Sequence, residues 1–322
     1  MLPMNLPAFN RRAWPADGIL DTWHTPDGWP LRRFRMGEGA RGRMLVVGGR
    51  GDMIEKYLEP VMHWAARGWQ VATFDWRGQG GSGRLTPDPL LGHGPDFGLL
   101  VDDLAAIYYD WCGGAGPNIL LAHSMGGHLA LRAMAEGRVK PDAAVLTAPM
   151  LGLRSAPIPE SVAPWVARAI GMTGLSGRPA WKDNPYSPFR KARLTHDAER
   201  YADDLWWREQ TPEVALGAPS WGWIGEAYRS TRALEKSRAI EAMRVPTLIL
   251  ATSADRLVSP AAITRVAARL PDVRLHVYGE EAAHEILREA DAVRLDAFGR
   301  IDDFNLIGNT TQKRFIDELL GF

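Results

Sequence analysis

The sequence predicts an α/β protein, with a mostly parallel, doubly wound sheet and a mainly helical segment inserted before its last strands. Short apolar runs rich in Val, Ile and Leu recur along the chain, separated by stretches with helical spacing. Their apolar residues are continuous rather than alternating, which is typical of parallel strands buried on both faces. Such alternation favours helices packed on both sides of one sheet. The predicted parallel strands are 44–48, 70–75, 118–122, 143–148, 247–252 and 274–279.

The other elements of the predicted core are a hairpin and helices. Residues 21–36 contain a Pro-Asp-Gly turn, which predicts an antiparallel hairpin ahead of the parallel strands. Residues 56–68, which end at a glycine, and residues 96–111 both have helical spacing of their apolar residues. We therefore expect a helix in each of the first two connections between parallel strands.

The alternation breaks between residues 150 and 244. This stretch contains prolines, helical patterns and six of the thirteen tryptophans, but no clear strand. We expect a mainly helical cap at 150–244, inserted into a core made of residues 1–149 and 245–322.

Composition narrows the class of protein. Lys plus Arg and Asp plus Glu both number 38 in 322 residues, which disfavours a nucleic-acid binder. The single cysteine, Cys112, excludes an internal disulfide and a Cys-rich zinc site. The N-terminus lacks a signal-peptide pattern, and no apolar run approaches the roughly 18 residues of a membrane span. We expect a cytoplasmic protein, with peripheral attachment to a membrane as an open alternative, and no obligate protein partner.

The segment "NILLAHSMGGHLALRAM" places a serine between a predicted strand and a predicted helix. Ser124 follows His123, and small residues flank it two positions away on each side, at Ala122 and Gly126. Strand, serine and helix in this order form a nucleophile elbow, whose sharp turn presents the hydroxyl at the carboxyl end of the strand. A Ser-Gly turn without catalytic meaning is the alternative. Gly127 completes the group of residues that we expect to support the turn.

A nucleophilic serine needs a base, and the base needs an orienting acid. In a fold of this kind both should follow the serine, each after a later strand, with the acid first. Asp255 follows the strand at 247–252, and His284 follows the last strand. We therefore predict a triad of Ser124, His284 and Asp255. Two other acids lie near His284 and remain rivals for the acidic role, Glu280 and Glu281.

Stabilisation of a negative oxygen requires two backbone N–H groups. Met125, directly after the serine, should provide one of them. The loop "VVGGRGDMIEKY" follows the first parallel strand, and its glycines, Gly48 and Gly49, allow a close turn. We expect the N–H of Arg50 to be the second donor.

A rival motif indicates a different class of enzyme. Gly78, Gly80 and Gly83 match the dinucleotide fingerprint G-x-G-x-x-G, and Asp102 lies at a suitable distance beyond them. Such a fingerprint must open a helix. Because prolines follow at 87 and 89, we expect a loop instead and disfavour a nucleotide-dependent oxidoreductase.

Several segments together resemble the lysophospholipase L2 branch of the α/β-hydrolases, which groups with monoacylglycerol lipases and with a serine aminopeptidase-like (S33) set. They are "FDWRGQGGSGR", "VDDLAAI", "LLAHSMGGHLALR", "PTLILATSADRLVSP" and "AAHEILRE". The resemblance implies an α/β-hydrolase fold, the catalytic roles predicted above and no cofactor or metal. Two positions depart from the relatives: Ala122 replaces a usual Gly, and Gly48 replaces the His usual before Gly in monoacylglycerol lipases.

The resulting hypothesis is a serine carboxylic-ester hydrolase acting on lysophospholipids or monoacylglycerols, presented in solution or from a membrane surface. A serine hydrolase of small esters or peptides is the alternative, and a non-catalytic α/β-hydrolase is less favoured. The aromatic cap suits an apolar substrate. It is also compatible with tryptophans that form only the core of the cap. The candidates for contacts with substrate are Met150, Trp206, Trp207 and Trp223.

Overall fold

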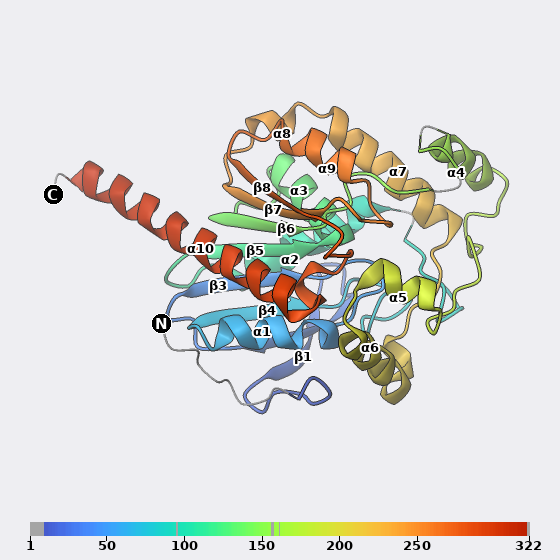
Figure 1. Ribbon diagram of the computed structural model, residues 1–322, viewed down its shortest axis with the longest axis horizontal. Coiled ribbons are helices and arrows are strands. Elements are labelled where there is room, and N and C mark those ends of the chain that lie inside the picture. The colour runs from blue at the N-terminus through green and yellow to red at the C-terminus, as the bar shows by residue number, and fades with distance from the viewer. Residues whose placement is uncertain (1–9, 95, 156–157, 161, 321–322) are drawn as a thin grey trace.

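The computed structural model describes residues 10–94, 96–155, 158–160 and 162–320, with side chains described as far as residue 305. One eight-stranded sheet runs through it in the order β1-β2-β4-β3-β5-β6-β7-β8 (Figure 1). The first two strands form an antiparallel hairpin, and β2 pairs antiparallel with β4. All further pairings, from β4 to β8, are parallel. The prediction of a mostly parallel sheet preceded by a hairpin is confirmed.

The strands lie close to their predicted positions. Their bounds are β1 (Ile19–His24), β2 (Pro30–Met36), β3 (Gly42–Val47), β4 (Trp69–Phe74), β5 (Asn118–His123), β6 (Ala143–Thr147), β7 (Thr247–Thr252) and β8 (Val273–Tyr278). The first five parallel strands are mostly buried, as continuous apolar runs predict. The last is not, because β8 is the edge strand and Arg274, Leu275 and Val277 are exposed there. Its apolar run therefore marks an edge rather than a strand buried on both faces.

Helices cover both faces of the sheet, so it is doubly wound. The core helices are α1 (Leu58–Ala65), α2 (Phe97–Trp111), α3 (Ser124–Ala135), α9 (Pro260–Ala267) and α10 (Asp291–Leu320), with short 3-10 turns η1 (Ile54–Tyr57) and η3 (Ile286–Arg288). One hydrophobic cluster joins α2, α3 and α9 to the sheet, and a second joins α1 and α10 to the opposite face. On β5, Leu120 belongs to the first cluster and Leu121 to the second, as the alternation of a strand requires.

The chain between β6 and β7 is mainly helical. It contains α4 (Ala163–Gly171), α5 (Pro188–Leu194), α6 (Ala198–Gln210), α7 (Trp221–Lys236) and α8 (Ala239–Ala242), with a 3-10 turn η2 (Pro212–Val214). Figure 1 shows α4, α5 and α6 along one side of the molecule, beyond the ends of the strands. Among the described residues no helix is both long and apolar enough to cross a membrane.

Candidate active site

The backbone turns sharply where β5 meets α3. Strand β5 ends at His123 and the helix begins at Ser124, whose φ of 52° lies in the left-handed region that side chains disfavour. A Cβ at Gly126 would lie 2.4 Å from the carbonyl oxygen of Gly48, and one at Gly127 would lie 2.9 Å from the Cβ of Pro149. Both glycines are therefore required by close approach. Residue 122 is fully buried and carries alanine.

The structure brings Ser124, His284 and Asp255 together in one hydrogen-bonded chain. Nε2 of His284 lies 2.8 Å from Oγ of Ser124, and Nδ1 lies 2.7 Å from Oδ2 of Asp255. The second oxygen of Asp255 accepts the N–H groups of Leu257 and Val258 at 2.8 and 2.9 Å. Asp255 is acceptor-only when ionised, so Nδ1 carries the proton and Nε2 is free to accept from the serine hydroxyl.

The surroundings of His284 shift the pKa of its imidazole. Burial by itself would lower the pKa of His284, but the charge and hydrogen bond of Asp255 raise that pKa above its ordinary value. Burial would likewise raise the pKa of Asp255, but His284 and the two backbone N–H groups hold it below its usual range. The carboxylate is therefore ionised at neutral pH and can stabilise an imidazolium.

The rival acids lie elsewhere. Glu280 and Glu281 are both exposed, and Glu281 accepts the N–H of Gly279 at 2.8 Å within its own turn. The two ring nitrogens of His284 contact Asp255 and Ser124. Of the three acids considered, Asp255 alone contacts the imidazole.

The loop after β3 leaves one N–H group without an acceptor beside Ser124. The N–H of Gly49 donates to Oδ2 of Asp52 at 2.6 Å, and that of Gly51 donates to Oε1 of Gln79 at 2.7 Å. Between them, the N–H of Arg50 has no acceptor among the described residues. A Cβ at Gly49 would lie 2.9 Å from the Cβ of Ser124, so the loop passes directly over the serine.

The second predicted donor is also free. Met125 is the second residue of α3, and the N–H groups of a first helical turn have no partner within the helix. Its N–H has no acceptor among the described residues. The two N–H groups flank Ser124 from the start of α3 and from the loop after β3, as a site for a developing oxyanion requires. Their catalytic role stays a prediction.

His123 is closer to the base than the sequence indicates. Its Nδ1 lies 3.0 Å from the carbonyl oxygen of Thr147. Its ring, however, packs against that of His284, with 4.8 Å between the centroids. Burial, followed by the neighbouring His284, lowers the pKa of His123 to about 4. The ring is therefore neutral at physiological pH, and an apolar contact supports the base.

A buried cluster of charges, not predicted from the sequence, lies behind the loop after β3. Nζ of Lys56 contacts a carboxylate oxygen of Asp52 and lies 2.5 Å from Oε1 of Glu285. Arg288 binds the other oxygen of Glu285 at 2.5 Å. The cluster joins the N–H-donating loop to the residue after His284. The only signal in the sequence is the spacing of Asp52 and Lys56, which are four residues apart, one before η1 and one within it.

The four residues predicted to contact substrate lie in three different places. Met150 is buried in the core, and its N–H donates to the carbonyl oxygen of Ser124 at 2.9 Å. Trp207 packs against Trp14 and donates its indole N–H to the carbonyl of Arg11, and Trp206 packs on Trp207. Trp207 therefore packs against the N-terminal segment and not within a core of the inserted segment alone.

Of these four residues, Trp223 contacts the loop after β3, which carries the Arg50 N–H. The guanidinium of Arg50 lies 5.3 Å from the centre of its ring. The Trp223 side chain also lines a cavity of about 250 Å³. That cavity borders the loop after β4 and the start of α2 rather than Ser124, with lining residues Arg77, Gln79, Leu85, His93, Gly94, Asp96, Leu99, Leu100 and Trp223.

The glycine-rich loop after β4 opens no helix. Residues 75–94 contain turns and a single bridge, and α2 begins only at Phe97. Gly78, Gly80 and Gly83 have φ values of 76°, 50° and 73°, and a Cβ at Gly80 would lie 2.2 Å from the carboxyl carbon of Asp75. The glycines therefore fold the loop around a buried carboxylate, which explains the motif without a nucleotide.

Comparisons with known proteins agree with this geometry. The family model described as Serine aminopeptidase, S33, matches residues 38–291. The chain belongs to this family. Lysophospholipase L2 of Escherichia coli strain K12 is 32% identical over 297 residues, which cover 86% of this chain and 84% of the relative. The predicted membership of the α/β-hydrolases, on the branch of lysophospholipase L2, is confirmed.

Solved structures confirm the fold of this S33 family member. A soluble variant of monoglyceride lipase from Saccharomyces cerevisiae, in complex with a substrate analog, matches with a TM-score of 0.70 at 17% identity, covering 94% of this chain and 100% of that one. The monoacylglycerol lipase of Paleococcus ferrophilus matches with a TM-score of 0.66 at 19% identity, covering 85% and 98%. The predicted α/β-hydrolase fold is thus confirmed, and the family model together with the lysophospholipase L2 relatives confirms the hydrolase class.

Proposed function

We propose that this S33 family member is a serine carboxylic-ester hydrolase that forms an acyl-enzyme on Ser124, with His284 as base and Asp255 as orienting acid. The observation that carries the proposal is the continuous chain of hydrogen bonds from Ser124 Oγ through both nitrogens of His284 to Asp255. The two unpaired N–H groups of Arg50 and Met125 support it, because they meet the further requirement of acyl transfer.

The reaction proceeds in two halves. Nε2 of His284 takes the proton of Ser124 while Oγ bonds to the carbonyl carbon, and the oxygen that becomes negative is held by Arg50 N–H and Met125 N–H. The imidazolium, stabilised by Asp255, then protonates the alcohol oxygen as its bond to carbon breaks. Water attacks the acyl-enzyme with the same base, which releases the carboxylic acid and restores Ser124.

We further propose single-chain lipid esters, lysophospholipids or monoacylglycerols, as the substrates. Similarity to lysophospholipase L2 and the fold shared with monoglyceride lipases support this class. The surface of the segment between β6 and β7 supports it as well. Eight of the fifteen large hydrophobic residues that are exposed in the described part of the chain lie there: Ile158, Val162, Trp165, Met172, Leu175, Trp181, Tyr186 and Phe189.

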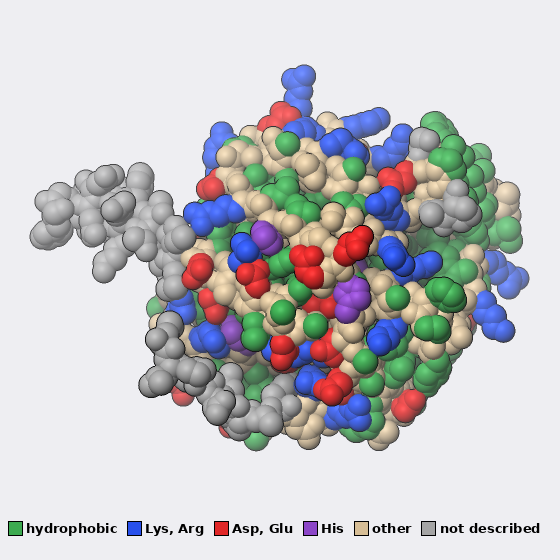
Figure 2. Space-filling model, viewed as in Figure 1, with side chains coloured by type: hydrophobic (Ala, Val, Ile, Leu, Met, Phe, Trp, Pro, Cys, Tyr) green, Lys and Arg blue, Asp and Glu red, His purple; other side chains and the backbone are tan. Residues whose placement is uncertain are grey.

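Charge on the same segment favours an anionic lipid surface. Residues 158–194 contain six Lys or Arg and only two Asp or Glu, although the whole chain is neutral. Figure 2 shows hydrophobic side chains gathered on the side of the molecule where α4 and α5 lie, with basic side chains among them. Apolar rings together with basic residues are typical of surfaces that bind membranes peripherally. We propose that residues 150–244 are a cap that takes substrate from such a surface.

The test compares substrates and a nucleophile variant. Purified protein is assayed on lysophosphatidylcholine, a monoacylglycerol, a short p-nitrophenyl ester and an aminopeptidase substrate, and Ser124→Ala is treated with a fluorophosphonate probe. We expect the highest kcat/KM on a lipid ester and no labelling of the variant. A higher kcat/KM on the peptide than on every ester would favour the aminopeptidase alternative that the family description suggests. Labelling of the variant would remove Ser124 from the mechanism.

A further inference from the structure

A residue of the segment between β6 and β7 holds the oxyanion loop, residues 49–52, from outside the core. Nη2 of Arg208, on α6, donates to the carbonyl oxygen of Gly51 at 3.0 Å, and its Nη1 donates to that of Leu216 at 3.3 Å. Its Nε pairs with Asp204 at 3.1 Å. The side chains of Arg208 and Asp204 are only 8% and 2% exposed, so these contacts are shielded from water.

Both ends of Gly51 are therefore fixed. Its N–H is bound by Gln79 and its carbonyl by Arg208, while the N–H of Gly49 is bound by Asp52. Gly51 itself has φ of 71°, a conformation available chiefly to glycine. The peptide that carries the Arg50 N–H lies between these fixed points, so its direction depends on them.

The side chain of Arg50 makes the reciprocal contact. Its Nη2 donates to the carbonyl oxygen of Gly217 at 2.6 Å, next to the carbonyl that Arg208 binds, and its guanidinium packs on Trp223. A Cβ at Gly92 would lie 2.1 Å from this nitrogen, so the absence of a side chain there admits the guanidinium. An arginine from each side thus links the oxyanion loop to residues 208–223.

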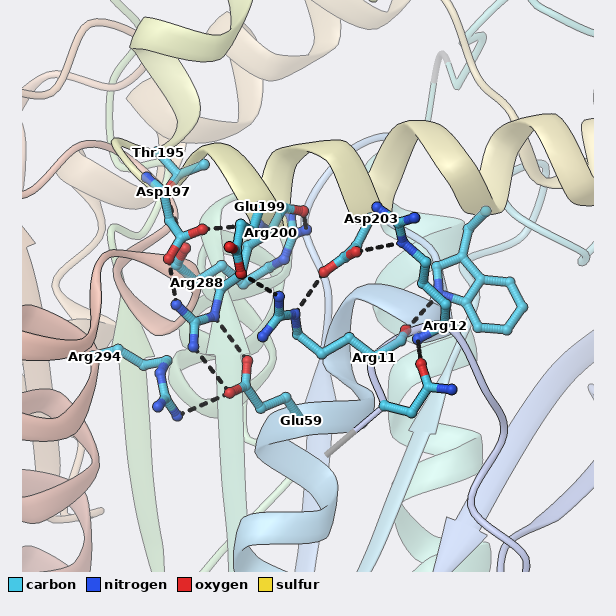
Figure 3. Close-up of polar contacts among 12 residues, drawn as sticks. Arg11, Arg12, Glu59, Thr195, Asp197, Glu199, Arg200, Asp203, Arg288 and Arg294 are labelled. Atoms are coloured by element: carbon cyan, nitrogen blue, oxygen red, sulfur yellow. Dashed lines mark hydrogen bonds and ion pairs between the residues drawn. The ribbon is translucent and has the colours of Figure 1, made fainter. Parts of the chain in front are cut away.

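Helix α6 can act as a fixed support because its first half is bound to the core. Arg200 pairs with Glu59 on α1 at 2.8 Å and with Asp291 on α10 at 2.8 Å. Asp203 accepts from Arg11 at 2.5 Å and from Arg12 at 2.7 Å (Figure 3). In Figure 3, Arg11 and Arg12 reach α6 from the N-terminal segment, and Glu59 reaches it from α1.

We propose that Arg208 is a positioning residue for the oxyanion hole, fixing the Gly51 carbonyl so that the Arg50 N–H points at the reacting carbonyl oxygen. The inference rests on the proposed function of Ser124. It makes α6 part of the catalytic machinery in addition to any role in covering the substrate. Arg208 lies behind the loop and acts through it.

The experiment separates positioning from folding with a matched pair of variants. Arg208→Met alone would leave Asp204 buried and unpaired, which is strongly destabilising. The comparison is therefore between two variants. In Asp204→Asn the amide oxygen can still accept from Nε of Arg208, and the carboxylates of Asp52 and Glu285 still act on the guanidinium. In the double variant Asp204→Asn/Arg208→Met neither charge of the pair remains. The assay uses a dissolved p-nitrophenyl ester, with active sites counted by fluorophosphonate titration. Arg265→Met, on α9 and away from the loop, removes an exposed ion-paired arginine whose partner Glu235 is also partly exposed, and is the control for loss of an arginine.

We expect the double variant to lose about tenfold in kcat relative to Asp204→Asn, since removing an oxyanion donor outright costs about 100- to 1000-fold. KM should change less than the turnover. An alkylboronic acid, which forms a tetrahedral anion on the serine, should bind more weakly by a similar factor. Arg208→Lys in the wild-type background should retain part of the activity, because its single ammonium can still donate to one carbonyl.

Equal kcat and equal boronate affinity in the double variant and in Asp204→Asn would overturn the inference. A rise in KM with unchanged kcat would overturn it too, because that pattern indicates substrate binding alone. Either result leaves the proposed function intact as long as the wild-type protein cleaves esters and Ser124→Ala does not. Failure of the proposed function would instead appear in the wild-type substrate panel.

Discussion

The chain between β6 and β7 divides into two parts that are held in opposite ways. The first part contains α4 and α5, and the second contains α6 and α7. In the first part, α5 has no buried residue, and Trp165 and Phe189 are 63% and 78% exposed. In the second part, α6 buries charged residues in ion pairs with the core, and α7 buries Trp223, Ala227 and Leu234 in the main hydrophobic cluster. The first part carries the exposed apolar side chains on which the proposed lipid contact rests, and the second part is fixed to the core.

The end of α5 joins the two parts. Thr195, directly after this helix, is fully buried, and its hydroxyl donates to the carbonyl of Arg288 at 2.9 Å. The N–H of Glu285 donates to the carbonyl of Leu194 at 2.8 Å. The loop that carries the base is therefore hydrogen-bonded to the same inserted segment whose earlier residues are exposed. The N–H of His284 also donates to the carbonyl of Arg193 at 3.4 Å, so the last turn of α5 is bound to this loop.

The largest expected effect comes from breaking the fixed part. Arg200→Met removes the arginine that pairs with both Glu59 and Asp197. The side chain of Arg200 is only 6% exposed, so both carboxylates lose a buried partner. Loss of one member of a buried ion-pair group costs about 3–5 kcal/mol. We expect a drop of that order in the free energy of unfolding, measured by urea titration. Arg168→Met, on exposed α4, is the matched control and should leave the unfolding midpoint unchanged. Equal midpoints for both variants would contradict the distinction between the two parts.

Truncation in the exposed part should change lipid binding and leave stability alone. Trp165→Ala/Phe189→Ala should weaken sedimentation with anionic phospholipid vesicles at least about tenfold, since one large apolar side chain contributes about 1.5–3 kcal/mol when buried. Turnover of a dissolved short ester should stay the same. Tyr109→Ala, on α2, removes an equally exposed ring outside the segment and serves as control. Unaltered vesicle binding by the double variant would assign the patch another role.

The charge cluster behind the base should set the pH profile. Glu285 raises the pKa of His284, after the larger effects of burial and Asp255. Glu285→Gln removes that negative charge and keeps one oxygen, which can accept from Lys56 or from Arg288 but not from both. The pKa of His284 should therefore fall. Because the base must be neutral to accept the serine proton, the acid limb of kcat/KM should move to lower pH. Exposed Glu280→Gln should leave the profile in place, and a shift to higher pH in Glu285→Gln would contradict this account.

The smallest effect is expected at the elbow itself, which belongs to neither part. Ala122→Gly restores the residue usual in relatives at a buried strand position. Glycine inside a strand costs about 0.5–1 kcal/mol in conformational entropy, so thermal unfolding should shift down slightly. Active-site geometry should persist, with kcat within about twofold of wild type. A large gain in kcat would show that the alanine methyl group restrains the turn.

The predictions from sequence succeeded where short-range patterns carry the information. Continuous apolar runs located the six parallel strands, and the order Ser124, Asp255, His284 after successive strands identified residues that do meet through 2.7 and 2.8 Å contacts. Rejection of a helix after Gly78 followed from two nearby prolines. The apolar run of β8 misled, because a strand at the edge has no neighbour on one side.

The sequence by itself determined the α/β architecture and the candidate triad, since periodicity, turn residues and order along the chain are local properties. Only the tertiary structure decided that Trp206 and Trp207 pack with the N-terminal segment, that Lys56 bridges Asp52 and Glu285, and that Arg208 reaches Gly51. Those pairings join residues up to 229 positions apart. The sequence gives no spacing rule for them, because each depends on how separately formed helices pack on the sheet.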